Sequence, residues 1–407
     1  MKEISGGVCA PKGFSAGGIR CGIKASFQKK DLALIYSEKT CNAAAMFTKN
    51  KVKAASVIVS QENIAGGKLR AIIANSGNAN ACTGQDGMAA AKRMAQLAAD
   101  ALGIPCTEVA VASTGVIGVP LPVAPIEKNI GALKESLRAD ELGHSSALEA
   151  IMTTDTRKKE IAVEIEIGGK PARIGAMTKG SGMIHPNMAT MLTFITTDAA
   201  IESAALDSAL RLAVAHSFNR MTVDGDTSTN DMVVIMANGT AGNAPVNAAG
   251  ADYAVFCAAL EYVCIMLARK MARDGEGATK LVTVTVTGAA SEKNAETLAK
   301  SIASSSLVKA ACFGADANWG RVLCAMGYAG ADFRPEKTDV SFASRAGDVL
   351  VCKNGESVVF SEEKAKLVLL EEEIEILVSL HEGDGQASVW GCDLTYDYVK
   401  INGDYRS

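Results

Sequence analysis

The chain has 407 residues, of which 48% are hydrophobic and 21% charged, with a net charge of −4 and a pI of about 5.8. This length and composition predict a globular protein with room for two or three domain-sized units. The slightly negative charge and the aromatic content of only 5% argue against nucleic acid as a partner. The N-terminus lacks the apolar core of a signal peptide and no run of 18 apolar residues occurs, so we expect a cytoplasmic protein without a membrane partner.

Apolar runs typical of strands alternate with amphipathic helical stretches along the whole chain. In the first half, the pattern predicts strands at 32–36, 56–59, 71–74, 108–112, 161–167 and 172–177, and helices at 87–102 and 126–138. In the second half, it predicts strands at 191–196, 232–236, 281–287, 322–327, 349–351 and 374–380, and helices at 203–216, 253–273 and 295–304. This alternation predicts an α/β (α+β) protein in which helices pack on sheets.

Some of the predicted strands bury only one face. Residues 163–167 have the sequence VEIEI and residues 373–376 the sequence EIEI, so apolar and charged side chains alternate. Strands of this kind suit mixed or antiparallel sheets better than a parallel sheet that is covered on both faces.

The eleven cysteines and four histidines show no spacing that is typical of a metal site. No C-x-x-C motif occurs, and no two histidines lie at helical spacing. The cysteine number is odd and the spacing is scattered, so we expect mostly reduced cysteines that act as small core residues. For His185 we expect a structural hydrogen bond.

Two loops resemble ligand-binding motifs only in part. Gly180 and Gly182 form a GxG without a third glycine in register or a following helix, which argues against a dinucleotide site. Residues 224–231, DGDTSTND, begin like a calcium loop, but Thr229 and Ile235 stand where such a loop needs a glycine and an acid. For this segment we expect a turn network of Asx and Ser/Thr hydrogen bonds without a catalytic role.

One threonine stands where a glycine-rich loop meets a strand-like run. Residues 177–192 have the sequence MTKGSGMIHPNMATML. Cleavage of the Ala189–Thr190 bond would place a new α-amino group, with an ordinary pKa of about 7.7–8.0, within reach of the threonine hydroxyl as its base. From the Ala-Thr dipeptide alone, a threonine that simply begins a strand is the simpler interpretation.

The longer segment, 179–192, resembles the autoprocessing segment of the ornithine acetyltransferases, the glutamate N-acetyltransferases of the cyclic arginine pathway. The resemblance extends from the first ten residues to the last, through segments 7–14, 74–84, 314–321 and 390–407. It implies self-cleavage into an α chain, 1–189, and a β chain, 190–407, two of each forming a heterotetramer. It also implies a layered sandwich of two stacked mixed sheets flanked by helices, similar to the N-terminal-nucleophile hydrolases but differently connected.

The resemblance also implies roles for individual residues. Thr190 would be the nucleophile, while the Thr114 hydroxyl and the Gly115 N–H would form the oxyanion hole. From the residues alone, an ordinary turn after a strand is the simpler explanation of residues 113–118. Many family members end in threonine where this chain has Ser407, which keeps a hydroxyl. The substrate-binding residues would be Thr153, Lys179, Thr190, Glu276, Asn402 and Ser407.

The implied reaction moves the acetyl group of N2-acetylornithine to Thr190 and then to glutamate, without a metal or other cofactor. Acetyl-CoA is a further donor that some relatives accept. Two alternatives remain at this level. An N-terminal-nucleophile amidase or aminopeptidase would resolve the acyl-enzyme with water and release free acetate. A non-enzymatic binding protein on the same fold would keep its chain uncut.

Overall fold

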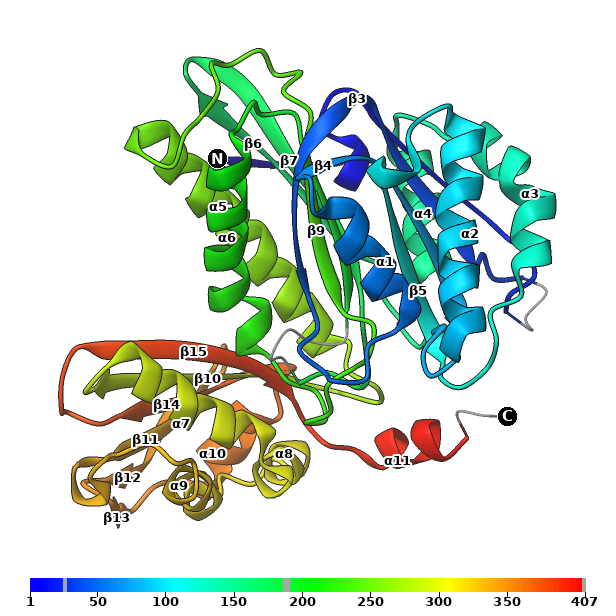
Figure 1. Cartoon of the computed structure of the whole chain (residues 1–407). Coiled ribbons are helices and arrows are strands. Elements are labelled where there is room, and N and C mark those ends of the chain that lie inside the picture. The colour runs from blue at the N-terminus through cyan, green and yellow to red at the C-terminus, as the bar shows by residue number, and fades with distance from the viewer. Residues whose placement is uncertain (25–27, 186–190, 405–407) are drawn as a thin grey trace. The chain divides into compact units, whose positions relative to one another are not determined.

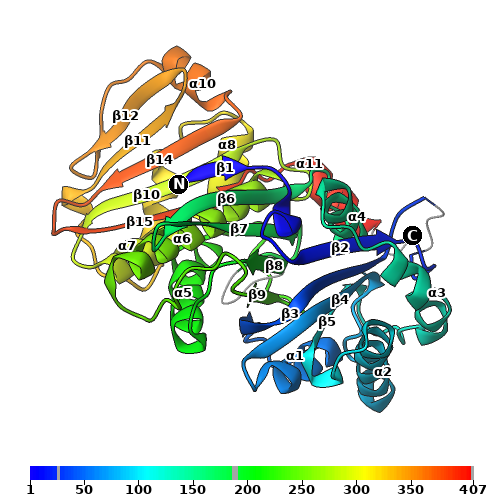
Figure 2. The ribbon, with the colours of Figure 1, turned by 90° about the horizontal axis from the view of Figure 1, so that it is seen from above.

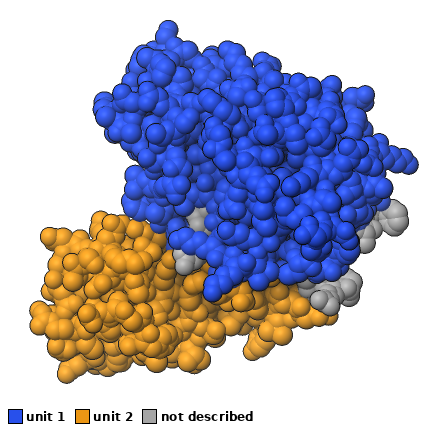
Figure 3. All heavy atoms as spheres, in the orientation of Figure 1, with its two compact units in different colours: residues 1–180, 187–219, 227–267 blue, residues 181–186, 220–226, 268–407 orange. Residues whose placement is uncertain are grey.

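The computed structural model describes residues 1–24, 28–185 and 191–404. Two compact units divide the chain, and Figure 3 colours them separately. Unit 1 comprises Met1–Gly180, Asn187–Asn219 and Thr227–Leu267, and unit 2 comprises Ser181–Pro186, Arg220–Asp226 and Ala268–Ser407. Each unit contains a mixed sheet with helices, which confirms the predicted α/β class with two mixed sheets flanked by helices. The stacking of one sheet on the other stays a prediction.

The described part of unit 1 (Figure 1) forms a nine-stranded sheet in the order β1-β6-β7-β8-β9-β3-β4-β5, with β2 paired to β3, and Figure 2 labels each of these strands. The pairs β4–β5 and β8–β9 are parallel, whereas the other neighbours are antiparallel. The strands are β1 (Lys2–Ile4), β2 (Phe14–Ile19), β3 (Leu32–Phe47), β4 (Lys68–Asn78), β5 (Val109–Val116), β6 (Lys159–Ile167), β7 (Lys170–Lys179), β8 (Leu192–Thr197) and β9 (Met232–Ala237).

Helices lie on both faces of the β3–β5 region (Figure 2). Leu34 of β3 belongs to the core that contains Met94 of α2, while its neighbour Ile35 belongs to the core that contains Leu148 of α4. Successive side chains on a strand point to opposite faces, so β3 is apolar on both. The helices of unit 1 are α1 (Ala55–Ile64), α2 (Gly84–Leu102), α3 (Val123–Glu135), α4 (Glu141–Ile151) and α5 (Ser203–His216), with short 3-10 turns η1 (Gly7–Cys9) and η2 (Cys106–Glu108). Helix α6 (Gly250–Arg273) and the 3-10 turn η3 (Phe218–Arg220) begin in unit 1 and end in unit 2.

The described part of unit 2 forms a six-stranded sheet in the order β13-β12-β11-β14-β10-β15. The β10–β14 pair is parallel and the remaining pairs are antiparallel. The strands are β10 (Leu281–Ala289), β11 (Asp339–Ser344), β12 (Gly347–Lys353), β13 (Glu356–Ser357), β14 (Glu373–Ser379) and β15 (Gly385–Cys392). The helices are α7 (Glu292–Ser304), α8 (Ser306–Phe313), α9 (Trp319–Gly327), α10 (Glu362–Leu369) and α11 (Tyr396–Gly403), with a 3-10 turn η4 (Pro335–Lys337).

The alternation predicted for 373–376 is present in β14. Ile374 and Ile376 are buried, whereas Glu373 and Glu375 are exposed. The buried side chains share one core with Leu298 of α7. This strand therefore has one apolar and one polar face, as predicted for a sheet of mixed direction.

Two predicted strands are wrong, because both segments are helical. Residues 56–59 lie in α1, where Val57 and Val59 are buried in two different apolar cores. Residues 322–327 lie in α9, which begins after Asn318, whose side chain accepts from the backbone N–H of Arg321. In both segments, β-branched residues pack into an apolar core from a helix. Tertiary packing therefore overrides their intrinsic preference for strands.

Among the described residues, α6 is long and apolar enough to cross a membrane by length and composition alone. A helix in the core of a globular protein passes the same test. Within unit 1, Phe256, Leu260 and Val263 of α6 are fully buried. Glu261, in the same stretch, lies 3.1 Å from His216 of α5. Helix α6 thus buries apolar side chains and also carries a charged side chain with an ion-pair partner. Both features favour a core helix over a membrane span.

Candidate active site

The first cluster lies in unit 1, where the last residue of β7 meets β5. Lys179 ends β7 and is only 5% exposed, and its ammonium donates to the Thr114 hydroxyl at 3.3 Å. Thr114 is also buried. Because Lys179 donates to the threonine oxygen, the hydroxyl hydrogen is available to another acceptor. The structure thus brings two of the predicted site residues together.

Gly115 follows Thr114 in a backbone conformation that requires glycine. Its φ is +137°, and a Cβ at this position would lie 2.3 Å from the carbonyl carbon of Gly77, its register partner on β4. Two glycines therefore allow a close approach of the parallel strands β4 and β5. The residue after Thr114 thus has no side chain, which is compatible with a backbone N–H that serves an oxyanion site.

Asp155 connects two segments that carry predicted site residues. One carboxylate oxygen accepts from the backbone N–H of Thr153 at 2.9 Å, and the other from that of Gly180 at 2.8 Å. Lys159 lies 2.6 Å away, and both side chains are buried. Burial by itself would raise the pKa of Asp155, but the cations of Lys159 and Lys179 hold it well below its usual range. Asp155 is therefore an anion that fixes Thr153 next to the end of β7.

In the sequence, the predicted cleavage site lies between β7 and β8. The two strands are antiparallel neighbours, with Lys179 opposite Leu192. Ala189 and Thr190 lie outside the described residues. Met191, the next residue, is buried, and its backbone N–H donates to Asp231 at 2.9 Å. Burial raises the pKa of Asp231 well above its usual range, despite this hydrogen bond. A buried carboxyl group with a raised pKa thus holds the residue that follows Thr190.

The second cluster lies in unit 2. Asn402 of α11 donates to the Glu276 carboxylate at 2.8 Å, so two more predicted site residues are neighbours. Glu276 packs against Gly182, where a Cβ would lie 2.2 Å from the carboxylate. The Glu276 backbone N–H donates to the Ser181 carbonyl at 2.9 Å. Gly182 thus makes room for a buried carboxylate. Ser407 lies outside the described residues.

The turn network predicted for 224–231 is confirmed. Asp226 donates its N–H to Asp224, and Asn230 donates its N–H to the Ser228 hydroxyl, as in Asx and Ser/Thr turns. Asp224 also accepts from the backbone N–H groups of Met183 and Ile184 at 2.6 and 2.8 Å. This carboxylate therefore anchors the loop that carries Gly182.

The remaining histidine and cysteine predictions concern groups outside these clusters. His185 lies 3.1 Å from the Thr222 hydroxyl, in agreement with a structural hydrogen bond, and burial lowers its pKa. All eleven cysteines are free, and six of them are buried. Within residues 1–24, 28–185 and 191–404, no group of three or more His, Cys, Asp or Glu side chains could hold a metal ion.

Comparison with known proteins identifies the family. The model of the ArgJ family matches residues 15–407. The chain belongs to the ArgJ family. It is 54% identical over 408 residues to the arginine biosynthesis bifunctional protein ArgJ of Symbiobacterium thermophilum and 51% identical over 407 residues to that of Caldanaerobacter subterraneus subsp. tengcongensis, in each case over the full length of both chains. The predicted resemblance is confirmed.

A solved structure supports the same assignment. The crystal structure of an arginine biosynthesis bifunctional protein argJ from Bacillus halodurans aligns with 50% identity and a TM-score of 0.50. The alignment covers 52% of this chain and 97% of that one. Family membership favours the enzyme over both alternatives, the hydrolase and the non-enzymatic binding protein.

Two carboxylates that organise the clusters were not predicted as site residues from the sequence. Asp155 lies within the predicted substrate segment, two residues after Thr153, and Asp231 ends the segment to which we gave no catalytic role. A signal for Asp155 existed, since Lys159 stands four residues later. For Asp231 no local signal existed, because its partner Met191 is 40 residues away.

Proposed function

We propose that this chain transfers the acetyl group of N2-acetylornithine to glutamate through an acetyl ester of Thr190, and that it also acetylates glutamate from acetyl-CoA. The curated relatives are named as bifunctional proteins of arginine biosynthesis. The observation that carries the proposal is the buried Lys179–Thr114 contact at the end of β7, the strand that precedes Ala189 and Thr190 in the sequence.

The mature enzyme is proposed to consist of chains 1–189 and 190–407. The pairing of β7 with β8 supports this division, because both products would keep strands in one sheet after the cut. The aligned chain of the Bacillus halodurans structure spans about half of this chain, as one product would. Two copies of each product would form a heterotetramer in the cytoplasm, as the resemblance implies.

In the first half-reaction, the Thr190 hydroxyl oxygen attacks the acetyl carbonyl of N2-acetylornithine while the α-amine of Thr190 takes its proton. The Thr114 hydroxyl and the Gly115 N–H stabilise the negative oxygen of the tetrahedral intermediate. The C–N bond then breaks, and the proton passes to the leaving α-amine of ornithine. Lys179 supports this step because it donates to the Thr114 oxygen and leaves the hydroxyl hydrogen free for the oxyanion.

In the second half-reaction, the α-amine of glutamate attacks the acetyl ester and loses a proton, and Thr190 leaves as the hydroxyl. The products are N-acetylglutamate and free enzyme. Acetyl-CoA would acylate the same oxygen and release its thiol. Proposed contacts to the amino acid come from Lys179 for the α-carboxylate and from Glu276, oriented by Asn402, for the side-chain amine of ornithine. Thr153 and Ser407 complete the proposed set.

Steady-state kinetics and mass spectrometry test this proposal together. Initial rates at several fixed glutamate concentrations should give parallel double-reciprocal lines, because one nucleophile carries the acetyl group between two substrates. An acetyl group should be found on Thr190 when N-acetylornithine is supplied without glutamate. Intersecting lines with an unmodified Thr190 would mean direct transfer in a ternary complex and would remove Thr190 from its role.

A further inference from the structure

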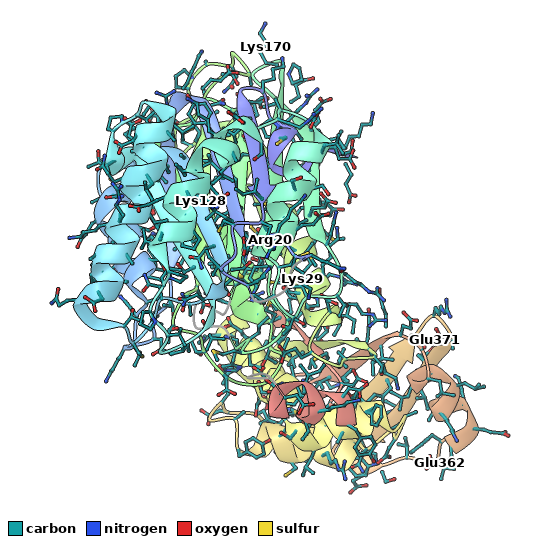
Figure 4. The ribbon with its side chains drawn as sticks, turned by 90° about the vertical axis from the view of Figure 1, so that its right-hand side faces the viewer. Arg20, Lys29, Lys128, Lys170, Glu362 and Glu371 are labelled. Atoms are coloured by element: carbon teal, nitrogen blue, oxygen red, sulfur yellow. The ribbon has the colours of Figure 1, made fainter. Side chains whose placement is uncertain are left out.

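A pocket of about 260 Å³ lies next to the predicted substrate residue Thr153, within unit 1. Three lysines line it: Lys24, Lys29 and Lys30. Lys30 is already engaged, because its ammonium lies 3.0 Å from Glu149 and 2.8 Å from the Ser146 hydroxyl. Lys29 is exposed, and Figure 4 labels it. The pocket is smaller than a typical cavity for a whole ligand, so it suits one charged group or side chain.

The two carboxylates of the same pocket already have cationic partners. Glu149 pairs with Lys158 at 2.6 Å as well as with Lys30. Asp155 pairs with Lys159 at 2.6 Å. Among the described residues, neither Lys24 nor Lys29 forms an ion pair with these two acids, and Asp155 acts on Lys24 only as a more distant charge.

Lys24 is held rigidly by its surroundings. The buried Asp31 accepts from four successive backbone N–H groups, those of residues 21–24, at 2.6 to 3.0 Å. The Lys24 ammonium donates to the carbonyls of Lys30 and Met152 at 2.9 and 2.7 Å. Of the three ammonium hydrogens, two are used in these bonds to described residues, which leaves one for a ligand.

Lys24 also lies beside the proposed oxyanion site. Its side chain packs on Gly77, where a Cβ would lie 2.8 Å from the Lys24 Cγ. Gly77 is the register partner of Gly115. Burial lowers the pKa of Lys24 to about 8, with further effects from Asp31, Lys29, Lys179 and Asp155. A bound anion would offset this cost of burying a cation.

We propose that Lys24, assisted by Lys29, binds an anionic group of a co-substrate, a carboxylate or a phosphate, in the pocket beside Thr153. This inference rests on the proposed acetyl transfer. The substrates differ in this respect: glutamate carries a second carboxylate and acetyl-CoA carries phosphates, whereas N-acetylornithine has a cationic side chain. The pocket would therefore serve the anionic substrates and contribute little to binding of N-acetylornithine.

The experiment compares KM values of the processed full-length enzyme for three substrates. Lys24→Met should raise KM about 10- to 100-fold for an anionic substrate, since a hydrogen bond from a charged donor is lost. KM for N-acetylornithine should rise much less. A larger rise in KM for glutamate than for acetyl-CoA would identify the bound group as the glutamate carboxylate. A rise confined to acetyl-CoA would identify it as a phosphate. Lys24→Arg should retain most of the affinity, because it keeps the charge.

Two further variants keep the test decisive. Lys29→Met changes an exposed lysine and should raise the same KM several-fold without disturbing the carbonyl contacts of Lys24. Lys128→Met removes the charge of another exposed lysine, on α3 (Figure 4), and should change no KM. Equal rises for all three substrates, or unchanged KM values in both the Lys24 and Lys29 variants, would overturn the proposal.

The failure of acetyl transfer itself would give a different result. If the wild type releases no ornithine from N-acetylornithine, the proposed function is wrong. Calorimetric titration with glutamate, and separately with CoA, then still measures whether Lys24→Met weakens binding of the anion.

Discussion

The two clusters of site residues differ in how the fold holds them. In unit 1, Lys179 at the end of β7 and Thr114 in β5 are both buried, and each belongs to a strand of the nine-stranded sheet. In unit 2, Asn402 is exposed on α11, an eight-residue helix without a buried residue. Reacting groups must be placed precisely, whereas recognition of a flexible amino-acid side chain tolerates a looser support. We therefore expect loss of the Thr114 hydroxyl to lower turnover and loss of the Asn402 amide to raise KM.

The largest effect should come from the nucleophile. Thr190→Ala should abolish both self-cleavage and acetyl transfer, because the hydroxyl that attacks in each reaction is lost. A denaturing gel should show one band near 42.2 kDa for this variant. The wild type should show two bands of about 20 and 23 kDa, in proportion to 189 and 218 of the 407 residues. Thr190→Ser should restore two bands, and a single band for the mature wild type would exclude the mechanism.

The next largest effect should come from Thr114→Ala. Loss of one oxyanion donor typically costs about 100- to 1000-fold in rate. The decrease should appear in kcat with little change in KM, because the hydroxyl binds charge that exists only in the tetrahedral state. Self-cleavage must be verified before the kinetics are compared. Thr114→Ser, which keeps the hydroxyl, should retain much of the activity, and a fully processed alanine variant with normal turnover would exclude Thr114 from the oxyanion hole.

In unit 2, Asn402→Ala should have a smaller effect, on KM. It removes the hydrogen bond that orients the Glu276 carboxylate, worth about 1.5 kcal/mol or roughly tenfold in binding. KM for N-acetylornithine should rise roughly tenfold, while kcat stays near that of the wild type. Lys400→Ala, an exposed change on the same helix, serves as the control. A loss of kcat at unchanged KM would contradict the division between the two clusters.

The smallest effect concerns Asp231 and the pH dependence of stability. Its pKa in the folded protein is raised above the unfolded value of 3.8, chiefly by burial. Its contribution to stability is therefore full below the unfolded pKa and is lost as the pH rises toward the folded pKa, by up to about 1.4 kcal/mol per pH unit. Asp231→Asn should remove this decline, since the amide oxygen can still accept from Met191.

Urea unfolding of wild type and Asp231→Asn from about pH 5 to about pH 8 measures this difference. The stability of the variant relative to wild type should increase with pH. Asp226→Asn, which changes an exposed carboxyl of the same loop, should leave the slope unchanged. Parallel curves for wild type and Asp231→Asn would mean that Asp231 does not titrate as proposed.

The strength of local signals explains which elements were predicted well. The helix predicted at 203–216 has those bounds in α5, and strand β14 follows the predicted alternation. Both have clear periodicity in apolar residues. Residues 56–59 and 322–327 are short apolar runs in which strand and helix cannot be distinguished by periodicity, and both became helices. The Asn318 N-cap of α9 was a usable signal that the strand prediction overlooked.

The sequence by itself determined the family, the predicted cut and the residue types for acyl transfer, because these depend on long contiguous motifs such as 179–192 and 390–407. The tertiary structure decided which side chains meet. Lys179 reaches Thr114 across 65 positions, Asp231 holds Met191 across 40, and Asn402 reaches Glu276 across 126. The pKa of a buried carboxyl depends on such neighbours, because Lys159 and Lys179 lower that of Asp155, whereas burial raises that of Asp231. Composition and spacing contain no information about these distances, since strand pairing and burial set them.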